Sequence, residues 1–78
     1  MRITYVPHAV EQMERRGISE EEVAAVLEDP NEEGPANLGR LYAQSVIAHR
    51  RIRVVYNRGA DEAVVVSVMF RRREGGGS

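Results

Sequence analysis

Apolar side chains in the first third of the chain recur every three or four positions, which is the spacing of a helix that buries one face. Pro7 suits the first helical position, because the N–H that proline lacks is not needed there. Gly17 is expected to end this helix in a left-handed conformation. The pattern predicts a helix over residues 7–16, preceded at residues 2–6 by a short strand or an extended arm.

A second helix is predicted directly after the first. Ser19 is followed three residues later by Glu22, the spacing of a capping box in which each residue bonds the other's backbone N–H. Ile18 and Val23 flank this box at the positions of a hydrophobic staple. Pro30 ends the pattern, since the residue before a proline is disfavoured in a helix. Two short helices joined by a tight turn are therefore expected.

The hydrophobic period changes to two in the second half of the chain. Residues 31–37 are acidic, contain Gly and Pro, and are expected to form a loop. Three strands should follow, the last buried on both faces because it is an almost continuous β-branched run. The strands are predicted at residues 40–47, 51–56 and 63–70, joined by a turn at His49-Arg50 and a hairpin loop at residues 57–61.

These elements predict an α+β fold, with two short N-terminal helices packed on a three- to four-stranded, mainly antiparallel sheet. The 78 residues fit one domain over residues 1–74, and the Gly/Ser tail at residues 75–78 has the composition of a linker or an expression remnant. The chain has no cysteine and no apolar run of membrane-spanning length, so a cytoplasmic location without a membrane partner is expected.

Charge is divided between the two halves of the chain. Residues 1–36 carry three Arg and nine acidic residues, for a formal charge of −6, whereas residues 37–78 carry eight Arg and three acidic residues, for +5. The net charge of −1 hides this division. Arg binds phosphate and carboxylate through a flat, forked guanidinium, so the second half is suited to an anionic partner.

The chain resembles a small bacterial domain of unknown function. The resemblance rests on residues 8–19, which read His-Ala-Val-Glu-Gln-Met-Glu-Arg-Arg-Gly-Ile-Ser, and on the strand segments 51–56 and 64–68. That family typically begins His-Ala-x-x-Arg-Met-x-x-Arg-Gly-Ile, and it is similar at fold level to RelE/ParE-like toxins of toxin–antitoxin systems. Gln12 stands where the family pattern has its first Arg, so any phosphate contact made by that Arg would be missing here.

Two histidines are candidate catalytic residues. His8 begins a stripe along the first helix that continues through Gln12 to Arg16, and it could act as a base. His49 adjoins two Arg at the predicted turn and could act as an acid toward a leaving oxygen. The alternative is a structural histidine at position 8 and an exposed turn histidine at position 49, and the two form an acid/base pair only if the fold brings them together.

The candidate phosphate ligands are arginines. Arg51 and Arg53 should share one face of a strand, and several Arg on one sheet face would form a cradle for an RNA backbone. The alternative is a solvated polar face. One of Tyr5, Tyr42 and Tyr56 could stack on a base beside these Arg, and the alternative for each is a tyrosine at the edge of the core. The proposed RNA-binding residues are Arg16, Arg51, Arg53 and Arg71.

The leading hypothesis is a toxin-like RNA-binding domain that can extend to metal-independent ribonuclease activity, with no metal and no cofactor. The alternative is a catalytically inert interaction module whose basic sheet face binds an acidic protein, such as an antitoxin-like segment. A homodimer, in which the acidic helices of one copy meet the basic sheet of another, is a third hypothesis. A single pocket holding three of His8, Arg16, His49 and Arg51 would favour the enzyme.

Overall fold

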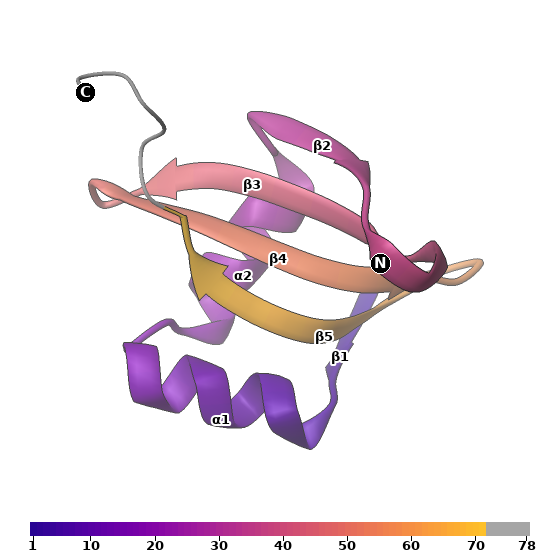
Figure 1. Cartoon of the computed structure of the whole chain (residues 1–78), viewed down its shortest axis with the longest axis horizontal. Helices are drawn as coiled ribbons and strands as arrows, with labels where there is room; N and C mark the ends of the chain where they lie inside the picture. The colour runs from indigo at the N-terminus through magenta and orange to yellow at the C-terminus, as the bar shows by residue number, and fades with distance from the viewer. Residues whose placement is uncertain (72–78) are drawn as a thin grey trace.

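Two helices cover one face of a five-stranded mixed sheet in the computed structural model, which describes residues 1–71 (Figure 1). The predicted α+β class is confirmed. In chain order the elements are β1 (Arg2–Tyr5), α1 (Pro7–Arg16), α2 (Glu20–Glu28), β2 (Glu32–Pro35), the 3-10 helix η1 (Asn37–Gly39), β3 (Leu41–Ile47), β4 (Arg50–Arg58) and β5 (Glu62–Phe70). The predicted tail at residues 75–78 lies outside the described residues.

The sheet has the strand order β1-β5-β4-β3-β2. Strand β1 runs parallel to β5, and every other neighbouring pair is antiparallel. The prediction of three or four strands was therefore too low. The predicted loop at residues 31–37 was also wrong, because Glu32–Pro35 pairs with β3 as an edge strand. Charged residues and proline are tolerated on an edge, where one side of the strand has no partner.

The junction between the helices follows the predicted capping chemistry. Gly17 ends α1 with φ 67° and ψ 39°, the left-handed conformation that glycine adopts without steric cost. The Ser19 hydroxyl accepts a bond from the Glu22 N–H at 3.1 Å, and the Glu22 carboxylate accepts one from the Ser19 N–H at 2.9 Å. Ile18 and Val23 are buried on either side of this box. The capping box is confirmed.

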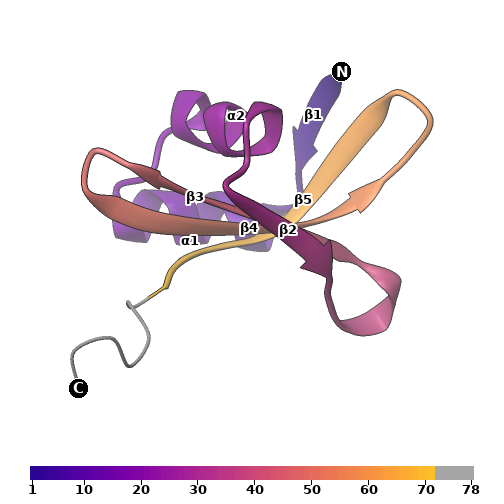
Figure 2. The same ribbon diagram turned by 90° about the horizontal axis from the view of Figure 1, so that it is seen from above.

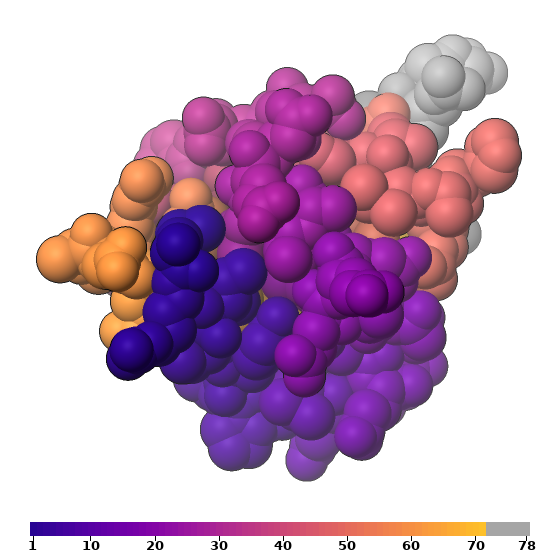
Figure 3. Space-filling model, turned by 180° about the vertical axis from the view of Figure 1, so that it is seen from behind, coloured from indigo at the N-terminus to yellow at the C-terminus, as the bar shows by residue number. Residues whose placement is uncertain are grey.

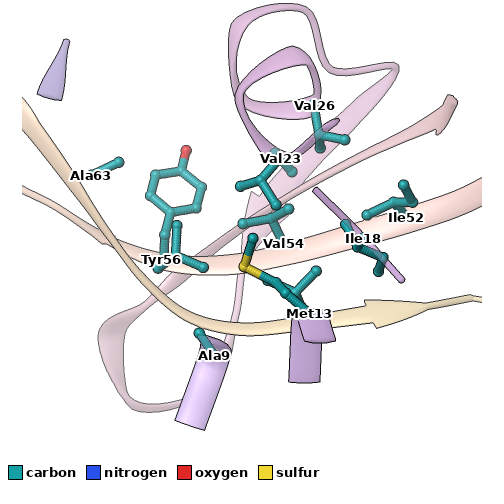
Figure 4. Close-up of a cluster of buried hydrophobic side chains, with 12 residues drawn as sticks. Ala9, Met13, Ile18, Val23, Val26, Ile52, Val54, Tyr56 and Ala63 are labelled. Carbon is teal, nitrogen blue, oxygen red and sulfur yellow. The ribbon is translucent and has the colours of Figure 1, made fainter. Parts of the chain in front are cut away.

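Strand β4 supplies fully buried side chains to the hydrophobic core between the sheet and the helices. Ile52 and Val54 are fully buried there, and Figure 4 shows Val54 close to Val23 of α2 and Met13 of α1. Each buried aliphatic side chain of this size stabilises the fold by about 1.5–3 kcal/mol. Helix α1 lies along β5, and α2 packs on β3 and β4, so both helices contribute to one core on one side of the sheet (Figure 2).

Strand β5 is buried on one face only, which corrects the prediction of burial on both. Ala63, Val65 and Val68 are fully buried in the core, whereas Val64 and Met69 are only partly buried. The irregular spacing arises because the β4–β5 register shifts between Val55 and Tyr56, leaving an extra residue in β5. The β-branched composition reflected strand propensity and was not evidence of a second covering layer.

Arg50 ties the sheet to the helix junction. Its guanidinium forms an ion pair with Glu22, donates to the Gly17 carbonyl at 3.3 Å, and lies 5.2 Å from the ring centroid of Phe70. The pKa of Glu22 is lowered, first by the hydrogen bond from the Ser19 N–H and then by Arg50. Arg50 is the first residue of β4. The β3–β4 turn therefore consists of Ala48 and His49, one residue earlier than the predicted turn at His49-Arg50.

Replacing Ser19 with Ala should lower the free energy of unfolding by about 1 kcal/mol, because the substitution removes the oxygen that caps α2. Urea denaturation of the two proteins measures the difference. Ser19→Asp is the matched control, since its carboxylate can still accept the Glu22 N–H and should retain most of the stability. An unchanged midpoint for Ser19→Ala would show that the capping box contributes nothing.

Candidate functional site

The face of the sheet opposite the helices is rich in arginine. Because side chains alternate along a strand and Ile52 and Val54 enter the core, Arg51 and Arg53 lie on the helix-free side. Arg71 follows β5, and its N–H donates to the Arg51 carbonyl at 2.9 Å. We use the name basic face for the helix-free surface formed by Arg40, Tyr42, His49, Arg51, Arg53 and Arg71.

No carboxylate in residues 1–71 lies within salt-bridge distance of an arginine of the basic face, although Glu32 lies on the same side and accepts a hydrogen bond from Tyr42. Within residues 1–71 the Arg50–Glu22 pair is the sole salt bridge, and it lies on the helix side. Arg51 and Arg71 are backbone-bonded neighbours that line the same cavity, so two like charges share one cavity. Like charges in this position destabilise a sheet. The arrangement therefore suits an anion supplied from outside the described chain.

Arg53 and Tyr42 form an ordered stack on this face. The guanidinium carbon of Arg53 lies 4.0 Å from the centroid of the Tyr42 ring, and its Nε donates to Gln44 Oε1 at 2.8 Å. The Tyr42 hydroxyl donates to Glu32 Oε2 at 2.7 Å, and this bond is the main reason that the pKa of Tyr42 is raised. The contacts with Tyr42 and Gln44 therefore fix the Arg53 guanidinium over the ring.

Two hollows on the basic face contain most of its arginines, and a third adjoins them beside β2, lined by Asn31, Glu32, Gln44, Ser45, Val46 and Arg51. The first has a volume of about 390 Å³ and is lined by Val46, His49, Arg51 and Arg71. The second, of about 380 Å³, contains the Arg53–Tyr42 stack; its other lining residues are Pro35, Ala36, Asn37, Arg40, Val55 and Met69. Arg51 and Arg53 stand two residues apart on β4, which separates them by roughly 7 Å.

The structure brings together His49, Arg51 and Arg71 in one hollow and Arg53 in the next, but it places the predicted residues His8 and Arg16 elsewhere. His8 is exposed in the first turn of α1, and Arg16 is partly buried in its last turn. Figures 1 and 2 show the start of α1 at the end of the sheet away from the β3–β4 turn. His8 and His49 therefore do not form an acid/base pair, and only two of the four residues expected in one enzyme pocket share it.

Gln12 supports the sheet edge. Strand β1 ends at Tyr5 opposite Val65, so the rest of β5 has no strand on that side. Gln12 Oε1 accepts the Val68 N–H at 2.8 Å and the Ser67 hydroxyl at 3.2 Å, which satisfies a backbone donor of a fully buried residue. The side chain at position 12 thus faces the edge of β5, away from the basic face.

Two members of the site were not among the predicted residues. Gln44 was detectable, because the period-two pattern already placed it on one face with Tyr42. Glu32 was not detectable, because its segment was interpreted as a loop, whereas β2 brings it beside Tyr42.

In the described part of the chain, no three His, Asp or Glu side chains gather as metal ligands, and no helix is long and apolar enough to cross a membrane.

Comparison with known proteins identifies a family over most of the chain. Residues 5–70 match the profile described as Domain of unknown function (DUF4258). No curated protein and no solved structure matches the chain. The match includes the α1–α2 junction and all the strands except the first residues of β1, so it covers the scaffold and every residue of the basic face except Arg71.

Replacing Gln12 with Arg should destabilise the protein by about 1–3 kcal/mol, because arginine has no acceptor for the buried Val68 N–H. Urea denaturation provides the measurement. Gln12→Glu retains an acceptor oxygen at the same position and should lose much less. If Gln12→Arg is as stable as the wild type, then the edge contact is unimportant, and arginine is acceptable at this position.

Proposed function

The chain belongs to the DUF4258 family, and we propose that it is a toxin-like module that binds single-stranded RNA through the basic face. The observation that carries this proposal is the combination of arginines that form no salt bridge within residues 1–71 with an Arg–Tyr stack on the same side of the sheet. Single-stranded nucleic acids are bound by cationic grooves that follow the backbone and by flat groups on which bases stack.

The two kinds of contact divide between the two hollows. Arg51 and Arg71 present guanidinium groups that form no salt bridge within residues 1–71 and would bind phosphate oxygens. Arg53 donates through Nε to Gln44 and lies over the Tyr42 ring, so its outer surface would offer a base a stacking platform. Because the platform is already ordered, little side-chain entropy is lost when a base binds.

An acidic protein segment is the alternative partner, since carboxylates also pair with arginine. The Arg53–Tyr42 stack favours RNA, because a carboxylate would gain little from a flat platform, whereas a base gains stacking energy. The helices of the acidic N-terminal half cover the other side of the sheet, and their negative charge would repel both RNA and an acidic protein there. Figure 3 shows the molecule from behind, with indigo and purple residues of this half forming most of the surface toward the viewer.

Metal-independent cleavage is a second candidate activity, supported by His49 in the same hollow as Arg51 and Arg71. In such a reaction a base takes the proton of the ribose 2′-OH, and arginines stabilise the charge on the pentavalent phosphorus. The proton that His49 carries would pass to the leaving 5′-oxygen. His8 lies at the end of the sheet away from this hollow, so it would not supply the base. RelE/ParE-like turnover would need another group to take the 2′-OH proton once RNA is bound.

RNA affinity should fall steeply with salt, because bound phosphates release counterions. The double variant Arg51→Ala/Arg53→Ala should flatten the plot of log affinity against log salt by about one to two units. Fluorescence anisotropy with a labelled single-stranded RNA measures this slope.

The matched control is Arg15→Ala/Arg58→Ala, which removes the same charge from exposed positions away from the basic face. This control should leave the slope nearly unchanged. Equal effects of the two double variants would show that net charge alone governs binding. The absence of RNA binding at low salt would contradict the proposed function and leave the acidic protein as partner.

Cleavage separates the two candidate activities. If the protein is a ribonuclease, His49→Ala should reduce cleavage of a labelled RNA in EDTA by about a hundredfold while affecting affinity little. His8→Ala is the control, because His8 lies outside the hollow, and it should cleave like the wild type. RNA left intact by the wild-type protein under conditions where it binds would eliminate the nuclease activity and retain the binding module.

A further inference from the structure

We propose that the hollow formed by His49, Arg51 and Arg71 is a site for the terminal phosphomonoester of an RNA strand. The inference rests on the proposed RNA-binding function and makes it specific, since it assigns one end of the RNA to one end of the sheet. Three features of the hollow support it: a repulsive arginine pair, a strained turn that carries the histidine, and a size suited to a terminal nucleotide.

The first feature is the pair formed by Arg51 and Arg71. The backbone bond from the Arg71 N–H to the Arg51 carbonyl places the two residues side by side on adjacent strands, and both line the hollow. No carboxylate in residues 1–71 lies within salt-bridge distance of either guanidinium. A group with a double negative charge would relieve this repulsion more than a phosphodiester, which carries a single charge.

The second feature is the β3–β4 turn. Ile47 pairs with Arg50, so Ala48 and His49 form a two-residue turn in which both have positive φ, 52° and 68°. Turns of this geometry strongly prefer Asn-Gly, because a Cβ is disfavoured at positive φ. The chain accepts strain at both positions, and the residue that it gains is an imidazole lining the hollow. Strain retained beside a charged cluster indicates a functional turn.

The third feature is the match between the hollow and a terminal nucleotide. A phosphomonoester presents three oxygens that accept hydrogen bonds, and the two guanidinium groups and the imidazole supply donors. The volume of about 390 Å³ leaves room beyond the phosphate for the attached ribose. The Arg53–Tyr42 platform occupies the next hollow along β4, at the roughly 7 Å spacing of alternate strand residues, where it could receive a base.

The test compares three RNA oligonucleotides of one sequence that carry a 5′-phosphate, a 3′-phosphate or hydroxyl groups at both ends, with an internal fluorophore. Anisotropy should show that one phosphorylated form binds about tenfold more tightly than the hydroxyl form, as expected for added charge-assisted hydrogen bonds. Whether the 5′- or the 3′-phosphate is preferred gives the direction of the strand on the sheet.

His49→Gly should abolish this preference for a phosphorylated end, and it should raise the urea midpoint because glycine accepts positive φ. Ala48→Gly is the matched control: it relieves the same kind of strain and keeps the imidazole, so the preference should persist. Equal affinity for all three RNAs, or a preference that survives in His49→Gly, overturns the terminal-phosphate site while the proposed function stands. Failure of every RNA to bind overturns both.

Discussion

The alternation of side chains along β4 determines both surfaces of this domain. Ile52 and Val54 enter the core beneath the two helices, and the residues between them must therefore face the other way. Those residues include Arg51 and Arg53, so the strand that anchors the fold also supplies the centre of the basic face. A slip of one residue in the β4 register would bury the arginines and expose the aliphatic residues, which the core strongly disfavours.

The positions of the helices follow from the same constraint. Helix α1 lies along β5, where β1 is too short to cover the whole edge, and Gln12 bonds the backbone that β1 leaves unpaired. Helix α2 packs on β3 and β4, and Arg50 joins its capping box to the start of β4. One layer of helices thus stabilises the sheet from one side and ties down its edge, and the opposite side remains open for a ligand.

The local elements of this fold could be predicted from sequence because their signals lie within a few residues of one another. The capping box at Ser19, the glycine that ends α1 and the period-two strands were all found in this way. The pairing of β2 with β3 was missed, because an acidic segment with Gly34 and Pro35 resembles a loop until a partner strand satisfies its backbone. The same omission hid the bond from Tyr42 to Glu32.

The candidate site shows a similar division between local and long-range information. Arg51 and Arg53 were found because both lie on one strand, and their shared face follows from alternation alone. The separation of His8 from His49 depends on how α1 crosses the sheet, which no local pattern reveals. The role of Gln12 depends on the length of β1, so a departure from a family motif became interpretable only when the unpaired edge of β5 was known.

The net charge of −1 says little about the proposed ligand, because the acidic residues of the helices and the arginines of the basic face lie in different layers, and Glu32 of β2 is the carboxylate that contacts the basic face through Tyr42. Packed layers in proteins are about 10 Å apart, and the Debye length at physiological ionic strength is about 8 Å. The acidic residues of the helices are therefore largely screened from a ligand on the basic face, whereas the arginines act on it at contact distance. At low salt the Debye length grows to about 30 Å, and the acidic layer then repels an anion that approaches from either side. For the proposed RNA ligand, the helix layer would thus favour an approach with the backbone toward β4, where the arginines are the nearest charges.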